Sequence, residues 1–406
     1  MEPFNGKRGA RLSPFILNLI EQVVGESTAG KLDRDARKVA DLSRLFTKDR
    51  SKLTREYLND PVHAAAYLRY FLPVNLAKIQ VLLDELPQEW LGRQRDYQLH
   101  VLDVGSGPGS GALAVLDWLN QRHPDCVRHL AVVAVDSSAD MLNQARRLWN
   151  GFCRESGFTR GSLTAFEGDL ERPVKGGWYG QITQRAPYDL IILANCLNEL
   201  FVDHVDPIGA KADLVSGLLP LLAQDGTVMI VEPALRETSR SLHHVRDRLL
   251  QEKHCTVYSP CLHEANCPAL VHPDDWCHEE RLWTAPAVVQ AIDRQIGFIK
   301  DALKFSYLLL RKDGRTIVAR SPQIFRVVSE LRELKGEKRA WLCNETGRPE
   351  VGRLDRLASP KNAAVDNWHR GAIVQIERIV RKEREGKVSA LGRIDQDAVV
   401  QVIRSV

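Results

Sequence analysis

A glycine-rich turn is the first feature that could do chemistry. Asp103-Val-Gly105-Ser-Gly107-Pro-Gly109 follows the short apolar stretch at residues 99–102. Glycine has no Cβ, so the backbone of such a turn can come close to a ligand. A helix that begins directly after the turn offers free N–H groups and the positive end of its dipole. The turn therefore predicts a pocket for the amino-acid part of S-adenosylmethionine.

The competing interpretation is a dinucleotide site, whose G-x-G-x-x-G pattern also follows a strand. That pattern fits only as Gly107-x-Gly109-x-x-Ala112, which begins two residues late and leaves Gly105 without a role. The leading acidic residue, Asp103, also matches the methyl-donor pattern better. We therefore favour the methyl donor.

Three further polar residues stand in the order that such a pocket needs. Asp136 ends a second predicted strand, where its carboxylate can accept both ribose hydroxyls, and Asp169 ends a third, within reach of the adenine amino group. Asn195 follows a fourth, at the carboxyl edge of the sheet where ligands of such folds bind. Each residue alone is typical of loop capping, whereas the ordered set favours cofactor binding.

No catalytic residue can be named. Enzymes of this fold that methylate amino groups usually carry D/N-P-P-Y after the fourth strand, but this chain has Asn195-Cys196-Leu197-Asn198-Glu199. Cys196 is a candidate nucleophile for pyrimidine C5 chemistry. A small buried hydrophobic residue is the commoner role for such a cysteine.

A cysteine-rich segment offers the second chemistry. Four cysteines fall within 23 residues, with the spacing C-x5-C-x5-C-x9-C: Cys255, Cys261, Cys267 and Cys277. Thiolates at this density outside an oxidising compartment indicate a metal or iron–sulfur site, although four unrelated thiols are the alternative. Neither the short C-x2-4-C pairs of zinc fingers nor the C-x3-C-x2-C of radical methyl-donor enzymes occurs. Nearby alternative ligands are His254, His263, His272 and His278.

The elements that must position these residues alternate between strand and helix from residue 99 onward. This alternation predicts a parallel α/β sheet of seven strands, in a Rossmann-like fold of the S-adenosylmethionine-dependent methyltransferase type. The expected strands contain HVLDV, AVVAVD, SLTAFEG, DLIILA and TVMIV, and KFSYLLLRKDG with TIVARSP is expected to close the sheet as a pair.

The chain is expected to divide into three parts. Residues 1–92 read as helical, with apolar residues at helical spacing and a kink or junction at Pro73. Residues 93–320 are expected to form the α/β domain, interrupted by a Cys-, His- and Pro-rich insertion at 250–284. Residues 321–406 read as a small basic β-rich module.

Charge and composition narrow the class of protein. The net charge of the 406 residues is +4, and 44% are hydrophobic, which is typical of a globular protein with a full core. Residues 321–406 hold 17 Lys and Arg against 12 Asp and Glu, a local excess of five that fits contact with nucleic acid phosphates or simply a solvated surface. No apolar run is long enough to cross a membrane. Eight cysteines without a secretory signal peptide indicate a reducing compartment.

The chain resembles the methyltransferase-like small-ribosomal-subunit assembly factors of mitochondria and bacteria. The pattern SPC-x5-CP followed by DWCH is the most specific part of the likeness, which spans most of residues 63–346. The matching pieces are AYLRYFLPVNLAKIQVLLDEL, the glycine turn, NCLNEL, MIVEPA, SPCLHEANCP, DDWCHEERLW, KFSYLLLRKDG and WLCNETG. The chain departs from the family at SPCLHE, at NCLNEL and in the tail after Gly347.

The resemblance implies binding to small-subunit rRNA, a bound S-adenosylmethionine and a [4Fe-4S] cluster, with zinc as the alternative. It implies that Cys261, Cys267 and Cys277 are joined by Cys343 of WLCNETG, whereas proximity in the sequence favours Cys255 as the fourth ligand. It also implies that members of the family can have little or no methyl transfer.

These observations and the resemblance predict a monomeric factor that binds the small ribosomal subunit and its rRNA in ribosome assembly or translation, with no membrane partner. Its S-adenosylmethionine-binding domain is expected to be either an rRNA methyltransferase or a vestigial one. An active methyltransferase on another RNA or a non-ribosomal substrate, and a non-catalytic iron–sulfur assembly factor, are the alternatives. The expected location is the bacterial cytoplasm, with the mitochondrial matrix as the alternative.

Overall fold

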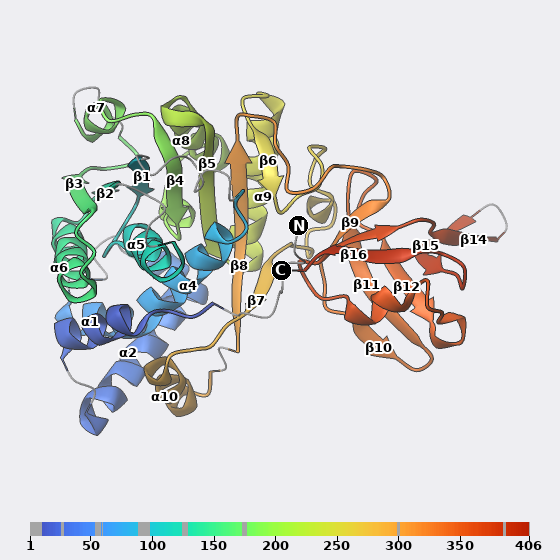
Figure 1. Cartoon of the computed structure of the whole chain (residues 1–406), viewed down its shortest axis with the longest axis horizontal. Helices are drawn as coiled ribbons and strands as arrows, with labels where there is room; N and C mark the ends of the chain where they lie inside the picture. Colours follow the sequence, from blue (N-terminus) through green and yellow to red (C-terminus); the bar gives the residue numbers. More distant parts are fainter. Residues whose placement is uncertain are drawn as a thin grey trace.

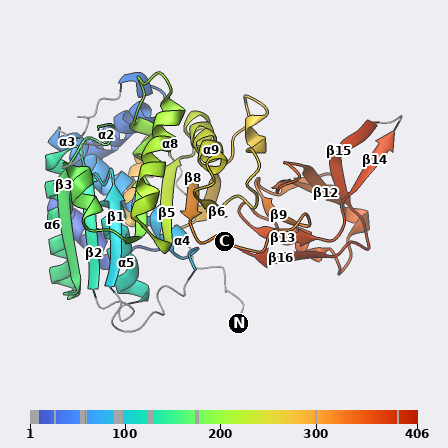
Figure 2. The ribbon, with the colours of Figure 1, turned by 90° about the horizontal axis from the view of Figure 1, so that it is seen from above.

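A computed structural model describes residues 10–25, 28–52, 58, 60–87, 98–123, 129–172, 177–298, 301–384 and 387–405. An α/β domain and a smaller β-rich module lie side by side in it (Figures 1 and 2). The boundary expected between residues 320 and 321 falls between the last strand of the first sheet and the first strand of the second. The boundary expected at residues 92 and 93 lies outside the described residues.

The methyltransferase-type α/β fold expected from the sequence is confirmed, but the sheet of the α/β domain is mixed and has eight strands, not the seven parallel strands that were predicted. Its strand order is β3-β2-β1-β4-β5-β8-β6, with β7 paired to β8. The first five strands pair in parallel, and β8 pairs antiparallel with β5, β6 and β7. The strands are β1 (Gln98–Val104), β2 (His129–Asp136), β3 (Gly161–Glu167), β4 (Tyr188–Ala194), β5 (Leu222–Pro233), β6 (Thr256–Ser259), β7 (Glu279–Leu282) and β8 (Ala302–Arg311).

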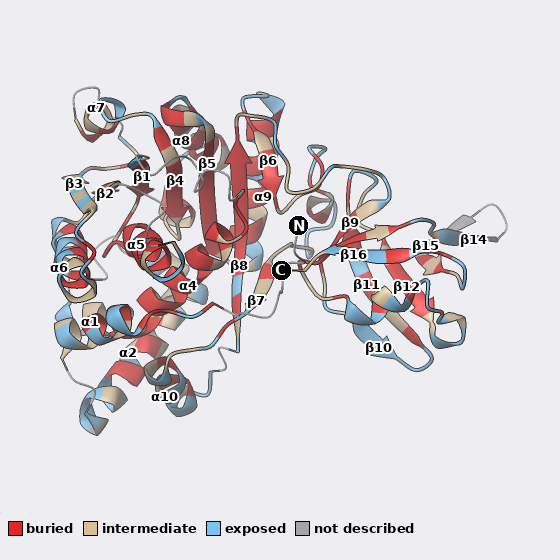
Figure 3. Cartoon of the chain, viewed as in Figure 1, coloured by how far each residue is buried: buried red, intermediate tan, exposed pale blue. Residues whose placement is uncertain are grey.

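The central strands are apolar almost throughout because helices cover both faces of the sheet. Figure 3 shows this buried centre. On β1, Leu99 and Val101 pack into one core, and Leu102 and Val104 into the other. The alternation of side chains along a strand thus supplies two layers of core from one sequence.

The helices divide between the two faces. One face packs against α1 (Pro14–Val24), α2 (Ala29–Thr47), the π-helical turn η2 (Tyr67–Phe71), α4 (Leu72–Leu83), α5 (Ser110–Arg122), α6 (Ala139–Ser156) and α10 (Ala287–Ile296). The other packs against α7 (Trp178–Thr183), η4 (Leu197–Glu199), α8 (Pro207–Leu218), η5 (Leu219–Leu221) and α9 (Arg236–Gln251). Short helical pieces are η1 (Arg50–Lys52), α3 (Pro61–Ala66) and η6 (Pro268–Leu270). No helix in the described part of the chain is long and apolar enough to cross a membrane.

The expected closing pair of strands is partly wrong. KFSYLLLR is a strand, β8, but the TIVARSP segment at residues 316–322 is not. The cysteine-rich segment provides the partners instead, because β6 and β7 flank Cys261, Cys267 and Cys277 and both strands pair with β8. Each of these strands is only four residues long, which is too short for sequence periodicity to predict the strand or its partner. The result is that the cysteine segment is anchored to the sheet at both ends.

The C-terminal module is a second sheet, with the strand order β14-β15-β12-β11-β9-β13-β16 and β10 paired to β11. Its core contains Phe325, Val327, Leu342, Trp368 and Ile394. The strands are β9 (Ile324–Val327), β10 (Arg332–Leu334), β11 (Glu337–Cys343), β12 (Glu350–Leu354), β13 (Ile373–Ile376), β14 (Val380–Arg384), β15 (Lys387–Ile394) and β16 (Val400–Arg404), with the short turns η7 (Asp355–Leu357) and η8 (Ala363–Asn367).

Buried charges join the module to the α/β domain. Arg326 of β9 donates to Glu279 of β7 at 2.5 Å and to the hydroxyl of Tyr307 on β8 at 2.9 Å. Glu85, just after α4, accepts from Arg281 and from Tyr307, both at 2.8 Å. All five residues are at most 5% exposed. We call them the seam network.

The charges of the seam network depend on one another. Burial raises the pKa of Glu85, but Arg281 and Arg326 outweigh this effect and hold it below its ordinary value. Arg404, at the end of β16, also donates to the backbone carbonyl of Glu85 at 3.2 Å. Removal of one partner of a buried ion pair leaves an uncompensated charge. This lowers the free energy of unfolding far more than the loss of an exposed ion pair does.

We predict that Arg326→Ala lowers the free energy of unfolding by roughly 3–5 kcal/mol, because Glu279 and Tyr307 then lose their shared cation. Urea denaturation followed by tryptophan fluorescence measures the change. The control is Arg378→Ala, which removes the exposed ion pair with Asp395 and should cost less than about 1 kcal/mol. Equal effects of the two variants would contradict a stabilising role for the seam network.

Candidate cofactor pocket and cysteine cavity

The first site is a pocket at the carboxyl edge of the parallel strands. The predicted residues Gly105, Gly107, Asp136, Asp169 and Asn195 line one pocket together. They come from the ends of β1, β2, β3 and β4, which the parallel pairing brings to one edge. The structure thus gathers five of the seven predicted cofactor residues and places Asp103 and Gly109 behind them.

Glycine is favoured at the three positions of the turn for different structural reasons. Gly105 has a φ of 67°, and a Cβ there would lie 2.5 Å from the Cβ of Cys196. Gly107 has a φ of 52°, and a Cβ there would meet no protein atom within 4 Å, so it would project into the pocket. At Gly109, a Cβ would lie 3.0 Å from the Cβ of Ala145 on α6. Only Gly107 is left free by the protein for a ligand.

Asp103 and Asp136 accept hydrogen bonds from backbone N–H groups in the turn and in the helix that follows it. Asp103 accepts the N–H of Ala112 at 2.8 Å and so caps α5. Burial raises the pKa of Asp103 to about 7. Asp136 accepts the N–H of Gly107 at 2.8 Å and that of Ser138 at 2.9 Å. Both carboxylates therefore shape the pocket, while Asp136 also lines it.

The other two predicted residues also lie in loops that follow strands. Asp169 accepts the N–H of Glu171 at 3.0 Å. Asn195 has a φ of 57°, a left-handed conformation that asparagine tolerates better than most residues. Its own N–H donates to Val231 of β5 at 2.7 Å, which fixes the segment after β4 against the next strand.

Sequence reasoning missed Tyr67, which lines the same pocket. It begins the π-helical turn η2, and such turns are frequent at functional sites. Asn75 donates to its hydroxyl at 3.2 Å. Burial, with a smaller contribution from Glu199, raises the pKa of Tyr67 to about 12. A single π-helical turn does not change the spacing of apolar residues enough to be predicted from the sequence. Only the tertiary structure shows that the N-terminal helices contribute to this pocket.

Cys196 lies beside the glycine turn, and its surroundings favour a neutral thiol that packs in the structure. Its Sγ donates to the carbonyl of Val104 at 3.3 Å. Burial raises its pKa well above the ordinary value, and Glu232, Glu199 and other carboxylates raise it further. Because the nucleophile in cysteine chemistry is the thiolate, these surroundings favour the packing role over the catalytic one.

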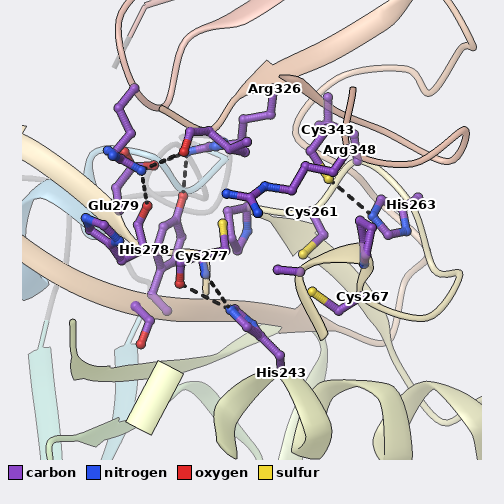
Figure 4. A pocket seen from close by; sticks show the side chains of 18 of the residues that line it. His243, Cys261, His263, Cys267, Cys277, His278, Glu279, Arg326, Cys343 and Arg348 are labelled. Carbon is purple, nitrogen blue, oxygen red and sulfur yellow. Dashed lines mark hydrogen bonds and ion pairs between the residues drawn. The ribbon is translucent and has the colours of Figure 1, made fainter. Parts of the chain in front are cut away.

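The second site is a cavity at the seam between the α/β domain and the C-terminal module. Cys261, Cys267, Cys277 and Cys343 all line it, and Figure 4 shows their sulfur atoms directed toward a common space. Burial, with a smaller contribution from the neighbouring Cys261, raises the pKa of Cys277 to about 11. Burial also raises the pKa of Cys343 well above the ordinary value, and the other three thiols add to the effect.

The two candidates for the fourth cysteine lie in different surroundings. Cys343, at the end of β11, reaches the cavity because β11 pairs with β9, where Cys343 stands opposite Arg326. Its Sγ lies 3.7 Å from Nε2 of His263. Cys255 is buried in the hydrophobic core of the α/β domain instead. The structure thus brings Cys343, and not Cys255, to the other three cysteines.

Cations and histidines surround the cysteine cavity. Arg348 and Arg370 line it, as does His243. Burial lowers the pKa of Arg246, but Cys261, Asp247 and Cys267 outweigh this effect and raise it. Among the predicted alternative ligands, His263 and His278 line the cavity, whereas His254 and His272 do not appear in its lining.

The four thiols reach the cavity from two parts of the chain, three from the segment between β6 and β7 and one from the end of β11. Among the described residues, no group of three or more His, Cys, Asp or Glu side chains is placed to hold a single metal ion. A zinc ion holds its thiolates within about 4 Å of one another, because each Zn–S bond is about 2.3 Å. A [4Fe-4S] cluster carries its four thiolates on four different irons, and therefore holds them farther apart.

The basic run lies at the far end of the C-terminal module. Arg381 and Lys382 are exposed on β14, and the β14–β15 hairpin projects away from the α/β domain (Figures 1 and 2). The side chains of Arg384 and Lys387 lie outside the described residues. The hairpin is therefore open to a large partner.

Comparison with known proteins gives one family. Residues 61–354 match the family model described as mitochondrial small ribosomal subunit Rsm22, and no curated protein matches the chain. Among solved structures, the plantazolicin methyltransferase BpumL in complex with SAH is 12% identical, with 73% of this chain and 99% of that chain covered and a TM-score of 0.33. The mitomycin 7-O-methyltransferase MmcR is also 12% identical, with 69% and 67% covered and a TM-score of 0.36.

Proposed function

The chain belongs to the mitochondrial small ribosomal subunit Rsm22 family, and on this premise we propose that it binds the small ribosomal subunit through rRNA, with S-adenosylmethionine and a [4Fe-4S] cluster as its resident groups. The observation that carries the proposal is the extent of the family match. Residues 61–354 include the glycine turn, the four gathered cysteines and the strands that join the two parts of the protein. The family description favours the mitochondrial location over the bacterial cytoplasm.

The pocket at the carboxyl edge of the sheet fits S-adenosylmethionine. The open face of Gly107 and the adjacent start of α5 suit the amino-acid part of the ligand. Asp136 and Asp169 offer carboxylate oxygens for the ribose and the adenine, as the sequence predicts. When bound, S-adenosylmethionine supplies an electrophilic methyl group. The chain's own residues provide the close backbone and the acceptors that orient it.

The cysteine cavity fits a [4Fe-4S] cluster better than it fits zinc. Its four thiols face a shared space, and no single-ion site exists among the described side chains. Arg348 and Arg370 add positive charge beside the anionic sulfur set, and such charges and hydrogen bonds to the sulfurs set the properties of a bound cluster. We infer that Cys261, Cys267, Cys277 and Cys343 are the ligands.

The rRNA-binding surface is proposed to include the basic run of the β14–β15 hairpin. Lysine and arginine side chains that neutralise phosphates release counterions, which makes binding fall with salt concentration. The exposed Arg381 and Lys382 lie in the part of the module that extends farthest from the α/β domain (Figure 1).

For the cofactor pocket, we predict that Gly107→Val abolishes binding of S-adenosylmethionine, because the branched side chain fills the space of the ligand. Isothermal titration calorimetry measures the binding. Gly157→Val is the matched control, since Gly157 also has a positive φ, 71°, and open space at its Cβ, but lies at the end of α6 away from the pocket. A Gly107→Val protein that binds with wild-type affinity would remove the basis for this pocket.

For the cluster, we predict that Cys343→Ser loses it and that Cys255→Ser keeps it, because only Cys343 reaches the cavity. Both proteins are prepared anaerobically, and iron, sulfide and visible absorbance are measured. The reverse result would show that Cys255 is the fourth ligand. Stoichiometric zinc without iron in the wild-type protein would exclude the iron–sulfur assignment.

For the rRNA contact, we predict that replacing Arg381, Lys382, Arg384 and Lys387 with Gln weakens binding to small subunits and flattens its salt dependence. The slope of log K against log salt should fall by roughly 0.7–0.9 for each lost phosphate contact. The matched control replaces four exposed cations of and beside α2, namely Lys31, Arg34, Arg37 and Lys48, and should leave the slope unchanged. If the hairpin variant keeps the wild-type slope, the basic run is only a solvated surface.

A further inference from the structure

The cysteines between β6 and β7 lie beside α9, the helix that precedes them in the chain. We call residues 260–278, which join β6 to β7 and carry Cys261, Cys267 and Cys277, the cysteine loop. Figure 4 shows His243 of α9 next to this loop. Side chains from one face of α9 contact the backbone of the loop. The path of the loop therefore depends on the helix as well as on the cysteines.

Arg240 holds the part of the loop between Cys267 and Cys277. Its Nη1 lies 3.1, 2.8 and 2.7 Å from three backbone carbonyl oxygens, those of Ala269, His272 and Asp275. A guanidinium has several donors in a rigid planar fork and no acceptor, so it can bind carbonyls that face one another. One side chain thus fixes the turn that separates these two cysteines.

Arg246 holds the part of the loop before Cys267 in the same way. It is fully buried, and it donates to the carbonyl of His263 at 2.5 Å and to that of Ala265 at 2.9 Å. The neighbouring Asp247 forms an ion pair with it and balances its charge. Hydrogen bonds from a charged donor are stronger than those between neutral groups, so this contact fixes the second turn of the loop.

Two of the cysteines are also held directly. Asp247 accepts the N–H of Cys267 with both carboxylate oxygens, at 2.9 and 3.2 Å. Nε2 of His243 lies 3.1 Å from the carbonyl oxygen of Cys277 and 3.3 Å from its nitrogen. These residues and the two arginines follow one another at intervals of three or four positions, so they share one face of α9.

This attachment bears on the kind of group that the cysteines can hold. Four thiolates on one zinc ion converge to within about 4 Å of one another, because each Zn–S bond is about 2.3 Å long. A [4Fe-4S] cluster carries one thiolate on each of four irons and keeps the thiolates farther apart. Among the described residues, no three such ligands are placed to hold one ion. For the cysteines to converge, the loop would have to leave its hydrogen bonds with α9.

We propose that α9 makes the cysteine site selective for a cluster over a single zinc ion, with Arg240, Arg246 and Asp247 as positioning residues. The inference rests on the proposed function, because it takes the cysteines as the ligands of the cluster. The three residues act through the backbone of the loop, which they hold at the spacing that several irons need. Without these contacts, the same cysteines can close around one zinc ion.

The first measurement is the zinc affinity of the full-length, metal-free protein, in competition with a chromophoric chelator. We expect Arg240→Met to bind zinc about ten-fold more tightly than the wild type, which is the scale on which outer-shell residues change metal affinity. Damage to the fold would weaken zinc binding instead, so the sign separates selectivity from a merely structural role. The matched control is Arg248→Met, because Arg248 lies on the same helix but pairs with Glu252. It should bind zinc as the wild type does.

The second measurement adds excess zinc to the cluster-loaded proteins and follows the iron–sulfur absorbance. The wild type should keep its absorbance, whereas Arg240→Met should lose it and take up about one zinc ion per chain. Asp247→Ala and Asp247→Asn form a second pair, since only the Asn variant keeps an acceptor oxygen for the N–H of Cys267. We expect the Ala variant to exchange its cluster for zinc and the Asn variant to restore the wild-type preference.

Unchanged or weaker zinc binding by Arg240→Met would overturn the proposal, and so would equal behaviour of Asp247→Ala and Asp247→Asn. If the wild type holds iron and sulfide while either of these results is obtained, only the role of α9 fails. If the wild type is isolated with zinc and no iron, the cluster assignment itself fails, and the selectivity proposed for α9 fails with it.

Discussion

The ion pairs between Arg326, Glu279, Arg281 and Glu85 hold the C-terminal module against the α/β domain, and the cysteine cavity depends on that contact. Arg326 stands opposite Cys343 in the pairing of β9 with β11, and Glu279 follows Cys277 by two residues. Hence two of the buried charges lie beside gathered thiols, Glu279 along the chain from Cys277 and Arg326 across a strand pair from Cys343. Because charges buried at this depth tolerate few arrangements, the relative position of the two parts of the protein is closely defined.

Because of this arrangement, a group bound in the cysteine cavity would also connect the two parts of the protein. Three of its thiols belong to the segment between β6 and β7, which is anchored to β8, and the fourth belongs to β11 of the module. A group bound by all four thiols would bridge the seam, and metal binding generally contributes directly to folding free energy. Such a bridge would act in parallel with the ion pairs, so that the basic hairpin is held at a fixed distance from the cofactor pocket.

The segment from Asn195 to Phe201 borders the proposed donor pocket in the α/β domain. It carries left-handed backbone at both of these residues, and Glu232 of β5 accepts the N–H of Leu197 within it at 3.0 Å. Strained conformations of this kind persist only where the surrounding structure fixes them. This segment thus forms a fixed wall of the proposed donor pocket.

Much of the α/β domain could be read from the sequence, because the apolar strands, the glycine turn and the polar residues after each strand are local patterns. Parallel pairing then brings Asp136, Asp169 and Asn195 to one edge as a consequence of the fold type. The sequence by itself also showed that cysteines cluster in one segment. Only the tertiary structure decided that Cys343, and not Cys255, lines the cavity with the other three cysteines, that β6 and β7 close the sheet, and that Tyr67 lines the cofactor pocket. Those placements depend on contacts between residues far apart in the chain, whose energies come from burial and charge pairing in three dimensions and leave no periodicity in the sequence.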